Sequence, residues 1–341
     1  MNTRTETLTD TLLEIRHLRT EFATIEGRGL AVDDVSFYVK RGETVAVVGE
    51  SGCGKTVTAL SILRLIPKPP GMITGGEILL EKRDLLKLSR QEIGAVRGKD
   101  IAMIFQEPMT SLNPVFTIGD QIVESIRTHE SASRKTTRAR AIDLLERVGI
   151  PDAQRLIDAY PHRLSGGMRQ RAMIAMALSC RPKLLIADEP TTALDVTVQA
   201  QILELLNELQ RNLDMALLII THNLGVVAQV AKRVVVMYAG CKVEEGITED
   251  IFRRPRHPYT RGLLGSMPRP PHNSGERPGK LREIPGMVPT LFQIPQGCPF
   301  RARCPVTVPK CAEERPGCEP VSATQSVSCW NPDPSAFEAN R

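Results

Sequence analysis

Five short apolar runs, rich in β-branched residues, recur along the chain at residues 43–49, 101–106, 183–189, 216–222 and 233–238. Runs of this length and composition predict strands that are buried on both faces of a sheet. Segments with helical periodicity lie between them, at residues 55–65, 117–128, 138–148, 167–179 and 196–212. This alternation predicts an α/β fold with a parallel sheet, in which ligands bind at the carboxyl ends of the strands.

The spacing of these elements predicts two domains. A nucleotide-binding domain is expected over residues 1–255, interrupted by a helical subdomain at about residues 107–165. After Ile251 prolines recur, which is typical of a linker and a loop-rich tail, so residues 256–341 are expected to form a second, smaller domain. No internal repeat is found, which indicates one catalytic unit per chain.

Composition narrows the class of protein. The chain is 41% hydrophobic and 24% charged, as expected for an ordinary globular protein. Its net charge of +5 comes from charges of mixed sign, so no nucleic-acid partner is expected. No apolar run approaches the ~20 residues that span a bilayer, and the first twelve residues lack the apolar region of a signal peptide. We expect the protein to reside in the cytosol.

A phosphate-binding loop follows the first apolar run. The segment Gly49-Glu50-Ser51-Gly52-Cys53-Gly54-Lys55-Thr56 fits the pattern G-x-x-x-x-G-K-[ST] between a predicted strand and a predicted helix. Glycines let the backbone amides turn toward the phosphates, and the helix N-terminus adds partial positive charge. Lys55 is expected to reach the phosphates of a nucleoside triphosphate, and Thr56 to bind Mg²⁺.

Two acidic residues end a later strand. Asp188 and Glu189 close the run 183–189, where a carboxylate can hold Mg²⁺ and its neighbour can act as the general base toward water. We assign the first role to Asp188 and the second to Glu189. His222 ends the next strand and is placed to contact a γ-phosphate. Together these residues predict a nucleoside triphosphatase.

A second anion-binding segment lies at residues 164–171, with the sequence LSGGMRQR. Ser165, Gly166 and Gly167 precede a predicted helix, and such a helix N-terminus binds anions. One nucleotide already has its phosphates in the first loop. The second segment therefore predicts a face-to-face dimer in which it completes the nucleotide site of another subunit.

The order of these motifs makes the chain resemble the ATP-binding subunits of ABC transporters over about residues 10–255. The matches are Gln106 as the Q-loop glutamine, 164–171 as the signature, 183–190 as Walker B, 193–195 as the D-loop and His222 as the switch histidine. The resemblance implies a P-loop ABC ATPase fold with a RecA-like core, an antiparallel β subdomain and a helical signature subdomain. It also implies that Gln106 contacts Mg²⁺ and the attacking water. An aromatic residue would stack on adenine, and we expect Phe22; the alternatives are Tyr38 as the stacking residue and a plain core role for Phe22.

Two stretches and the start of the tail narrow the resemblance to the oligopeptide/dipeptide/nickel permease family. They read FQEPMTSLNP at 105–114, EPTTALDVTVQAQ at 189–201 and HPYT at 257–260. The resemblance implies ATP-driven import of peptides, with two transmembrane permease subunits as partners. It further implies a second, homologous ATPase subunit or a self-dimer, an extracytoplasmic solute-binding protein, and a peripheral position on the cytoplasmic face of the inner membrane.

Other functions are weighed against this one. Nickel or another small solute could be the cargo, since nothing in the chain selects the solute. A soluble ABC ATPase of DNA repair or translation would usually carry tandem nucleotide domains, a long coiled-coil insertion or a basic contact face, and this sequence has none of them. The signature segment argues against a kinase or GTPase. A binding module that had lost hydrolysis is disfavoured because Lys55, Asp188, Glu189 and His222 are all present.

Five of the eight cysteines are concentrated at residues 298–329, which predicts a metal site because disulfides are disfavoured in a reducing cytosol. Spacing alone leaves zinc, an iron–sulfur cluster and unligated thiols open. The resemblance favours a [4Fe-4S] cluster on Cys298, Cys304, Cys311 and Cys329, with Cys318 as the substitute fourth ligand. We expect a structural role, because a proline-rich tail buries little core, and redox sensing is the alternative.

Overall fold

The computed structural model describes residues 10–106, 111–192, 194–267 and 283–332. They form two compact units, each assembled from segments that are far apart in the sequence. Unit 1 contains the chain up to Glu14, Tyr38–Thr44 and Ile78–Ile220; unit 2 contains Ile15–Phe37, Val45–Glu77 and the chain from Thr221. Strands β1 (Thr11–Thr24), β2 (Gly27–Lys40) and β4 (Gly71–Leu80) have residues in both units.

Unit 1 contains three parallel strands that the apolar runs predict. Strand β7 (Leu184–Asp188) lies between β6 (Ile101–Ile104) and β8 (Ala216–Thr221), and every residue of β7 and β8 is buried. Leu184 is opposite Ile101 on one side and Ala216 on the other. The prediction of buried parallel strands is confirmed for these three runs.

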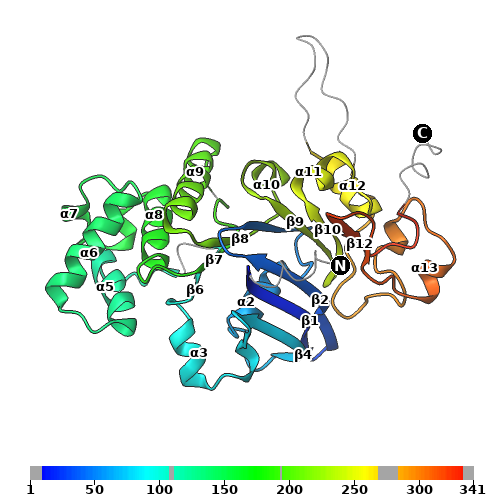
Figure 1. Cartoon of the computed structure of the whole chain (residues 1–341), viewed down its shortest axis with the longest axis horizontal. Helices are drawn as coiled ribbons and strands as arrows, with labels where there is room; N and C mark the ends of the chain where they lie inside the picture. Colours follow the sequence, from blue (N-terminus) through cyan, green and yellow to red (C-terminus); the bar gives the residue numbers. More distant parts are fainter. Residues whose placement is uncertain (1–9, 107–110, 193, 268–282, 333–341) are drawn as a thin grey trace, which may run out of the picture. The chain divides into compact units, whose positions relative to one another are not determined.

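Helices make up most of the rest of unit 1. Helices α5 (Ile118–His129), α6 (Arg134–Arg147), α7 (Ala153–Leu156) and α8 (Gly166–Ala177) pack together (Figure 1). Thr117, Ser133 and Ser165 cap α5, α6 and α8 by accepting a hydrogen bond from an amide in the first turn. The remaining elements are β5 (Arg83–Asp84), η1 (Leu85–Lys87), α3 (Arg90–Val96), η2 (Pro161–Arg163) and α9 (Val196–Leu213). The predicted helices are confirmed to within a few residues; residues 107–110, where the helical subdomain was expected to begin, lie outside the described residues.

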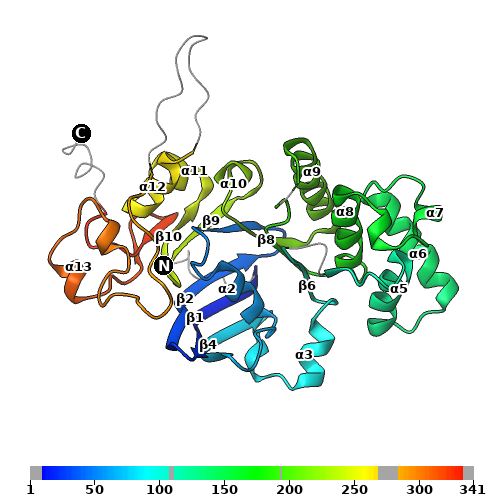
Figure 2. The ribbon, with the colours of Figure 1, turned by 180° about the vertical axis from the view of Figure 1, so that it is seen from behind.

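Unit 2 carries a mixed sheet that the tail extends. Strand β3 (Thr44–Val48) runs parallel to β9 (Arg233–Tyr238), and β9 is antiparallel to β10 (Cys241–Ile247). From the tail, β12 (Gln325–Val327) is antiparallel to β10, and β11 (Glu319–Pro320) pairs with β12 (Figure 2). The helices are α2 (Lys55–Ile62), α10 (Leu224–Val230), α11 (Thr248–Arg253), α12 (Pro258–Gly265), η3 (Arg301–Arg303) and α13 (Lys310–Glu313).

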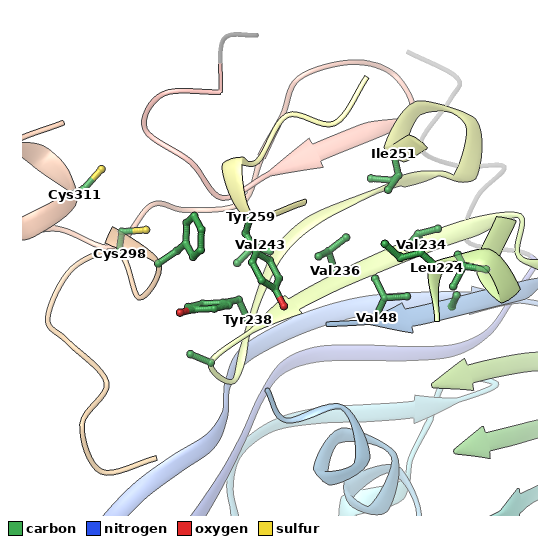
Figure 3. Packing of buried hydrophobic residues seen from close by; sticks show 14 residues of the cluster. Val48, Leu224, Val234, Val236, Tyr238, Val243, Ile251, Tyr259, Cys298 and Cys311 are labelled. Carbon is green, nitrogen blue, oxygen red and sulfur yellow. The ribbon is translucent and has the colours of Figure 1, made fainter. Parts of the chain in front are cut away.

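The tail also supplies part of the hydrophobic core of unit 2. Figure 3 shows the cluster, in which Cys298 and Cys311 extend a line of side chains that runs from Leu224 to Tyr238. Phe300 belongs to the same cluster and is 2% exposed. The expectation that the proline-rich tail buries little core is therefore wrong. Its aromatic and sulfur-containing side chains pack against β9 and β10 because β12 brings the chain back along that sheet.

Candidate functional site

The predicted phosphate loop joins β3 to α2 in unit 2, and its backbone leaves no room for side chains at two glycines. Gly54 has a φ of 97°, and a Cβ there would lie 2.3 Å from the carbonyl oxygen of Ala31. A Cβ on Gly49 would lie 2.2 Å from the carbonyl oxygen of Met237. The glycines of the motif are thus required by close backbone approach as well as by loop curvature.

Lys55 folds back over this loop. Its Nζ donates hydrogen bonds to the carbonyl oxygens of Gly49 at 2.7 Å and Glu50 at 2.9 Å, and the residue is 5% exposed. Thr56 follows it in the first turn of α2 and is exposed. An ammonium group on a loop of backbone amides at the N-terminus of a helix makes a site for an anion.

The predicted general base lies in unit 1, where β7 ends. Asp188 closes the strand and is 1% exposed, and Glu189 follows in the left-handed region with a φ of 46°. The amide of Glu189 donates to the carbonyl oxygen of Ile220 at 2.8 Å. Its carboxylate accepts hydrogen bonds from Gln106 Nε2 at 3.1 Å and Thr192 Oγ1 at 2.9 Å. A strained backbone fixed by such contacts is common at functional sites. The structure thereby brings together Gln106 and Glu189, which the sequence indicated separately.

The signature segment forms the N-terminus of α8, also in unit 1. The hydroxyl of Ser165 accepts a hydrogen bond from the amide of Met168 at 3.3 Å, and Gly166 and Gly167 form the first turn. Ser165 and Gly166 are exposed, so this helix end faces solvent. The exposed helix N-terminus fits the predicted second anion site.

The remaining predicted residues divide between the two units. His222 and Phe22 belong to unit 2, with the phosphate loop, whereas Tyr38 belongs to unit 1. His222 is exposed directly after β8, and Phe22 is half-buried in β1 with its ring against Gly71. Stacking of Phe22 on adenine stays a prediction, as does a single nucleotide site built from both units. Ala193 of the expected D-loop lies outside the described residues.

Sequence reasoning missed two residues that hold the phosphate loop. The side chain of Glu50 accepts hydrogen bonds from Arg303 of the tail, at 2.7 and 3.0 Å. The amide of Glu50 donates to the hydroxyl of Tyr259 at 2.8 Å. Tyr259 belongs to the HPYT segment, but no spacing in the sequence signals either contact.

The predicted metal ligands do not form a site for a single ion. In the described part of the chain, no three His, Cys, Asp or Glu side chains are grouped so that they could hold a metal ion. Cys298 and Cys311 are instead buried in the core of unit 2, and Cys304 packs against it. Burial raises the pKa of Cys304 to about 11 and that of Cys329 to about 12, which keeps these thiols neutral. Cys318 is exposed.

Family models match two parts of the chain. The model described as "ABC transporter" matches residues 32–192, which include the phosphate loop, the signature segment and Walker B. The model described as "Oligopeptide/dipeptide transporter, C-terminal region" matches residues 243–311. Within the described residues, no helix is both long and apolar enough to cross a lipid bilayer.

Curated relatives match nearly the whole chain. The dipeptide transport ATP-binding protein DppD of Bacillus subtilis is 52% identical and covers 96% of this chain and 97% of its own length. A putative peptide import ATP-binding protein of Brucella melitensis is 54% identical and covers 93% of this chain and 96% of its own length. The oligopeptide transport ATP-binding protein OppD of Bacillus subtilis is 52% identical and covers 95% and 90%.

Solved structures of ATP-binding cassettes share the fold. One cassette, solved as a dimer bound to ADP and phosphate, aligns with a TM-score of 0.62 and 26% identity, covering 69% of this chain and 98% of its own. The cassette cbiO1 from Clostridium perfringens aligns with a TM-score of 0.60 and 28% identity, covering 72% and 92%. The expected P-loop ABC ATPase fold is confirmed, whereas a separate cysteine-rich tail domain is not.

Proposed function

The chain belongs to the ATP-binding proteins of ABC transporters, and on that premise we propose that it hydrolyses ATP to power the import of peptides across the cytoplasmic membrane. The observation that carries the proposal is the likeness to a dipeptide transport ATP-binding protein at 52% identity over 96% of the chain. That likeness includes the tail, which the oligopeptide/dipeptide transporter model also matches.

The chemistry assigned to the chain begins with binding. The amides of residues 49–56 and the ammonium of Lys55 hold the β- and γ-phosphates. Thr56, Gln106 and Asp188 would hold Mg²⁺ through their oxygen atoms, and that ion would supply positive charge beside the phosphates. The carboxylate of Glu189 accepts a proton from the attacking water, while His222 donates toward the γ-phosphate. The hydrogen bond from Gln106 to Glu189 supports a joint role in placing that water.

The site needs a second cassette in this proposal. Ser165, Gly166 and Gly167 contact the γ-phosphate of ATP bound to a partner ATPase subunit, either a homologue or a second copy. Their exposure at the start of α8 and the dimeric state of the solved cassette support this arrangement. Two permease subunits and an extracytoplasmic solute-binding protein complete the importer, so the chain works at the inner face of the membrane.

Replacing Glu189 by Gln tests the ATPase assignment. The variant is expected to bind ATP as wild type does but to release phosphate at least about 100-fold more slowly, because an amide cannot take the proton. Glu204→Gln, on the exposed face of α9, is the matched control and should hydrolyse ATP normally. Normal turnover in the Glu189 variant would assign the base elsewhere, and failure of the wild-type protein to bind ATP would refute the proposed function.

Peptide import is tested in cells that lack the gene. Such cells are expected to lose growth on a dipeptide that supplies an essential amino acid, and wild-type protein but not Glu189→Gln should restore it. Loss of nickel uptake with unchanged growth on peptides would instead assign the chain to a nickel importer of the same family.

We also propose that Cys298, Cys304, Cys311 and Cys329 hold a [4Fe-4S] cluster that stabilises the tail. Support comes from the core of unit 2, in which Cys298 and Cys311 are buried together and against which Cys304 packs. A cluster separates its thiolates more widely than one ion does, and its iron would offset the cost of burying them. Cys318 is exposed, with its Sγ 3.5 Å from Ser326 Oγ.

The cluster is tested on protein purified without oxygen. Iron and sulfide are expected at about four each per chain. The Cys329→Ser variant should lose both, whereas the control variant Cys318→Ser should keep them. One zinc ion per chain would refute the cluster but keep a structural metal, and protein free of metal would refute both.

A further inference from the structure

Glu50, the second residue of the phosphate loop, is held from the tail at both its backbone and its side chain. Its amide donates to the hydroxyl of Tyr259, 209 residues later in the chain. Its two carboxylate oxygens accept hydrogen bonds from the two terminal nitrogens of Arg303, 253 residues later. A guanidinium that donates two parallel bonds to a carboxylate fixes orientation as well as distance.

The Arg303 side chain is itself held in place by other contacts, so it also holds the Glu50 carboxylate in place. The Arg303 side chain is 5% exposed. Its Nε donates to the carbonyl oxygen of Pro285 at 2.9 Å, and Nη2 also donates to that of Ile284 at 3.2 Å. The guanidinium lies 5.7 Å from the centre of the Tyr238 ring. Because Nε and Nη2 both donate to backbone carbonyl oxygens, the guanidinium is held in one position.

Tyr259 is an equally rigid anchor for the loop backbone. It is fully buried, and its ring meets that of Tyr238 edge-on with centroids 4.7 Å apart. Figure 3 shows both rings side by side in the cluster that the tail residue Cys298 extends. The backbone at the start of the phosphate loop is thus hydrogen-bonded to a side chain of the buried aromatic core.

The position and charge of the Glu50 carboxylate matter because Glu50 lies in a loop that binds anions. A negative charge there repels the triphosphate. Arg303 compensates that charge and holds the carboxylate in one orientation. We propose that Arg303 is a positioning residue for ATP: through Glu50, the tail sets the conformation and the charge of the phosphate loop. This inference rests on the proposed ATPase function.

The test compares ATP affinity in four proteins: wild type, Arg303→Met, Glu50→Gln and the double variant. With Glu50 present, Arg303→Met is expected to weaken ATP binding about tenfold, within the usual range of coupling between sites. In the Glu50→Gln background the same change should weaken it less than about twofold, since no charge remains to compensate. Arg301→Met, on the same short helix η3, is the matched control and should bind ATP as wild type does.

Two readouts separate positioning from folding. Arg303→Lys keeps the charge but not the paired bonds, so it should weaken ATP binding by about threefold, less than Arg303→Met does, and lower the unfolding temperature less than Arg303→Met. Equal weakening by Arg303→Met in both Glu50 backgrounds would overturn the proposal, as would wild-type affinity in both Arg303 variants. Failure of the wild-type protein to bind ATP would refute the proposed function itself, which distinguishes the two failures.

Discussion

Replacement of Phe300 by Ala is expected to detach the tail from the rest of unit 2 at low denaturant. Phe300 is 2% exposed, and its ring lies 5.1 Å from that of Tyr238, 5.4 Å from Tyr259 and 5.7 Å from His257. The substitution removes a buried aromatic ring from the point where the tail enters the core. It therefore tests directly whether hydrophobic burial holds the tail.

The expected loss of folding free energy depends on how far the neighbouring side chains can move into the space left by the Phe300 ring. Removing a buried Phe side chain costs about 3–5 kcal/mol, and the cost rises with the cavity that remains. The neighbouring rings cannot move into the space, because the hydroxyl of Tyr259 is bonded to Glu50 and that of Tyr238 accepts from Arg303 at 3.4 Å. We therefore expect a loss of about 4–5 kcal/mol, a large fraction of the 5–15 kcal/mol typical of a folded domain.

The single tryptophan of the chain provides the assay. Trp330 lies in the tail, where its Nε1 donates to the carbonyl oxygen of Glu314 at 2.9 Å and Lys310 lies over its ring. Its fluorescence during urea unfolding should report the earlier transition of Phe300→Ala. Met287→Ala is the control, because Met287 is 89% exposed. A loss below about 1 kcal/mol would refute the account and leave the tail to be held by other contacts.

Two further predictions concern unit 1. Ser165→Asp should keep the cap of α8 and the unfolding temperature but lower ATP turnover, because a carboxylate at the proposed second anion site repels the γ-phosphate; unchanged turnover would contradict that site. Hydrogen bonds from Lys183 and Arg41 lower the pKa of Glu81 from 4.5, so its charged form stabilises the fold above that pH. Glu81→Gln should therefore be less stable than wild type at pH 7, and urea titrations should show the difference shrinking as pH falls below about 4.5.

The sequence predicted the elements whose causes are local. The five apolar runs become β3, β6, β7, β8 and β9, because a continuous β-branched run has few alternatives to a buried strand. Five helices were predicted because helical periodicity is a pattern of neighbouring positions. The phosphate loop was found for the same reason, since glycine spacing between a strand and a helix is itself a local pattern.

The sequence did not predict what depends on distant contacts. The pairing of β12 with β10 and the burial of Phe300 join segments that carry no joint signal. Arg303 reads as one of many basic residues, and only the folded chain shows that it meets Glu50. The proline-rich composition of the tail suggested loops, whereas burial of a few aromatic side chains gives it a place in the core.

The order of segments in unit 2 has a consequence for synthesis of the protein. Strand β3, which leads into the phosphate loop, takes its parallel partner β9 about 190 residues later, with Val45 opposite Arg233. At 5–20 residues per second, the ribosome needs about 10 to 40 s to reach that partner. During this interval an apolar strand emerges with its edge unpaired, which is a state that invites aggregation. We therefore expect the nascent chain to be most prone to aggregation through this strand until β9 has left the ribosome.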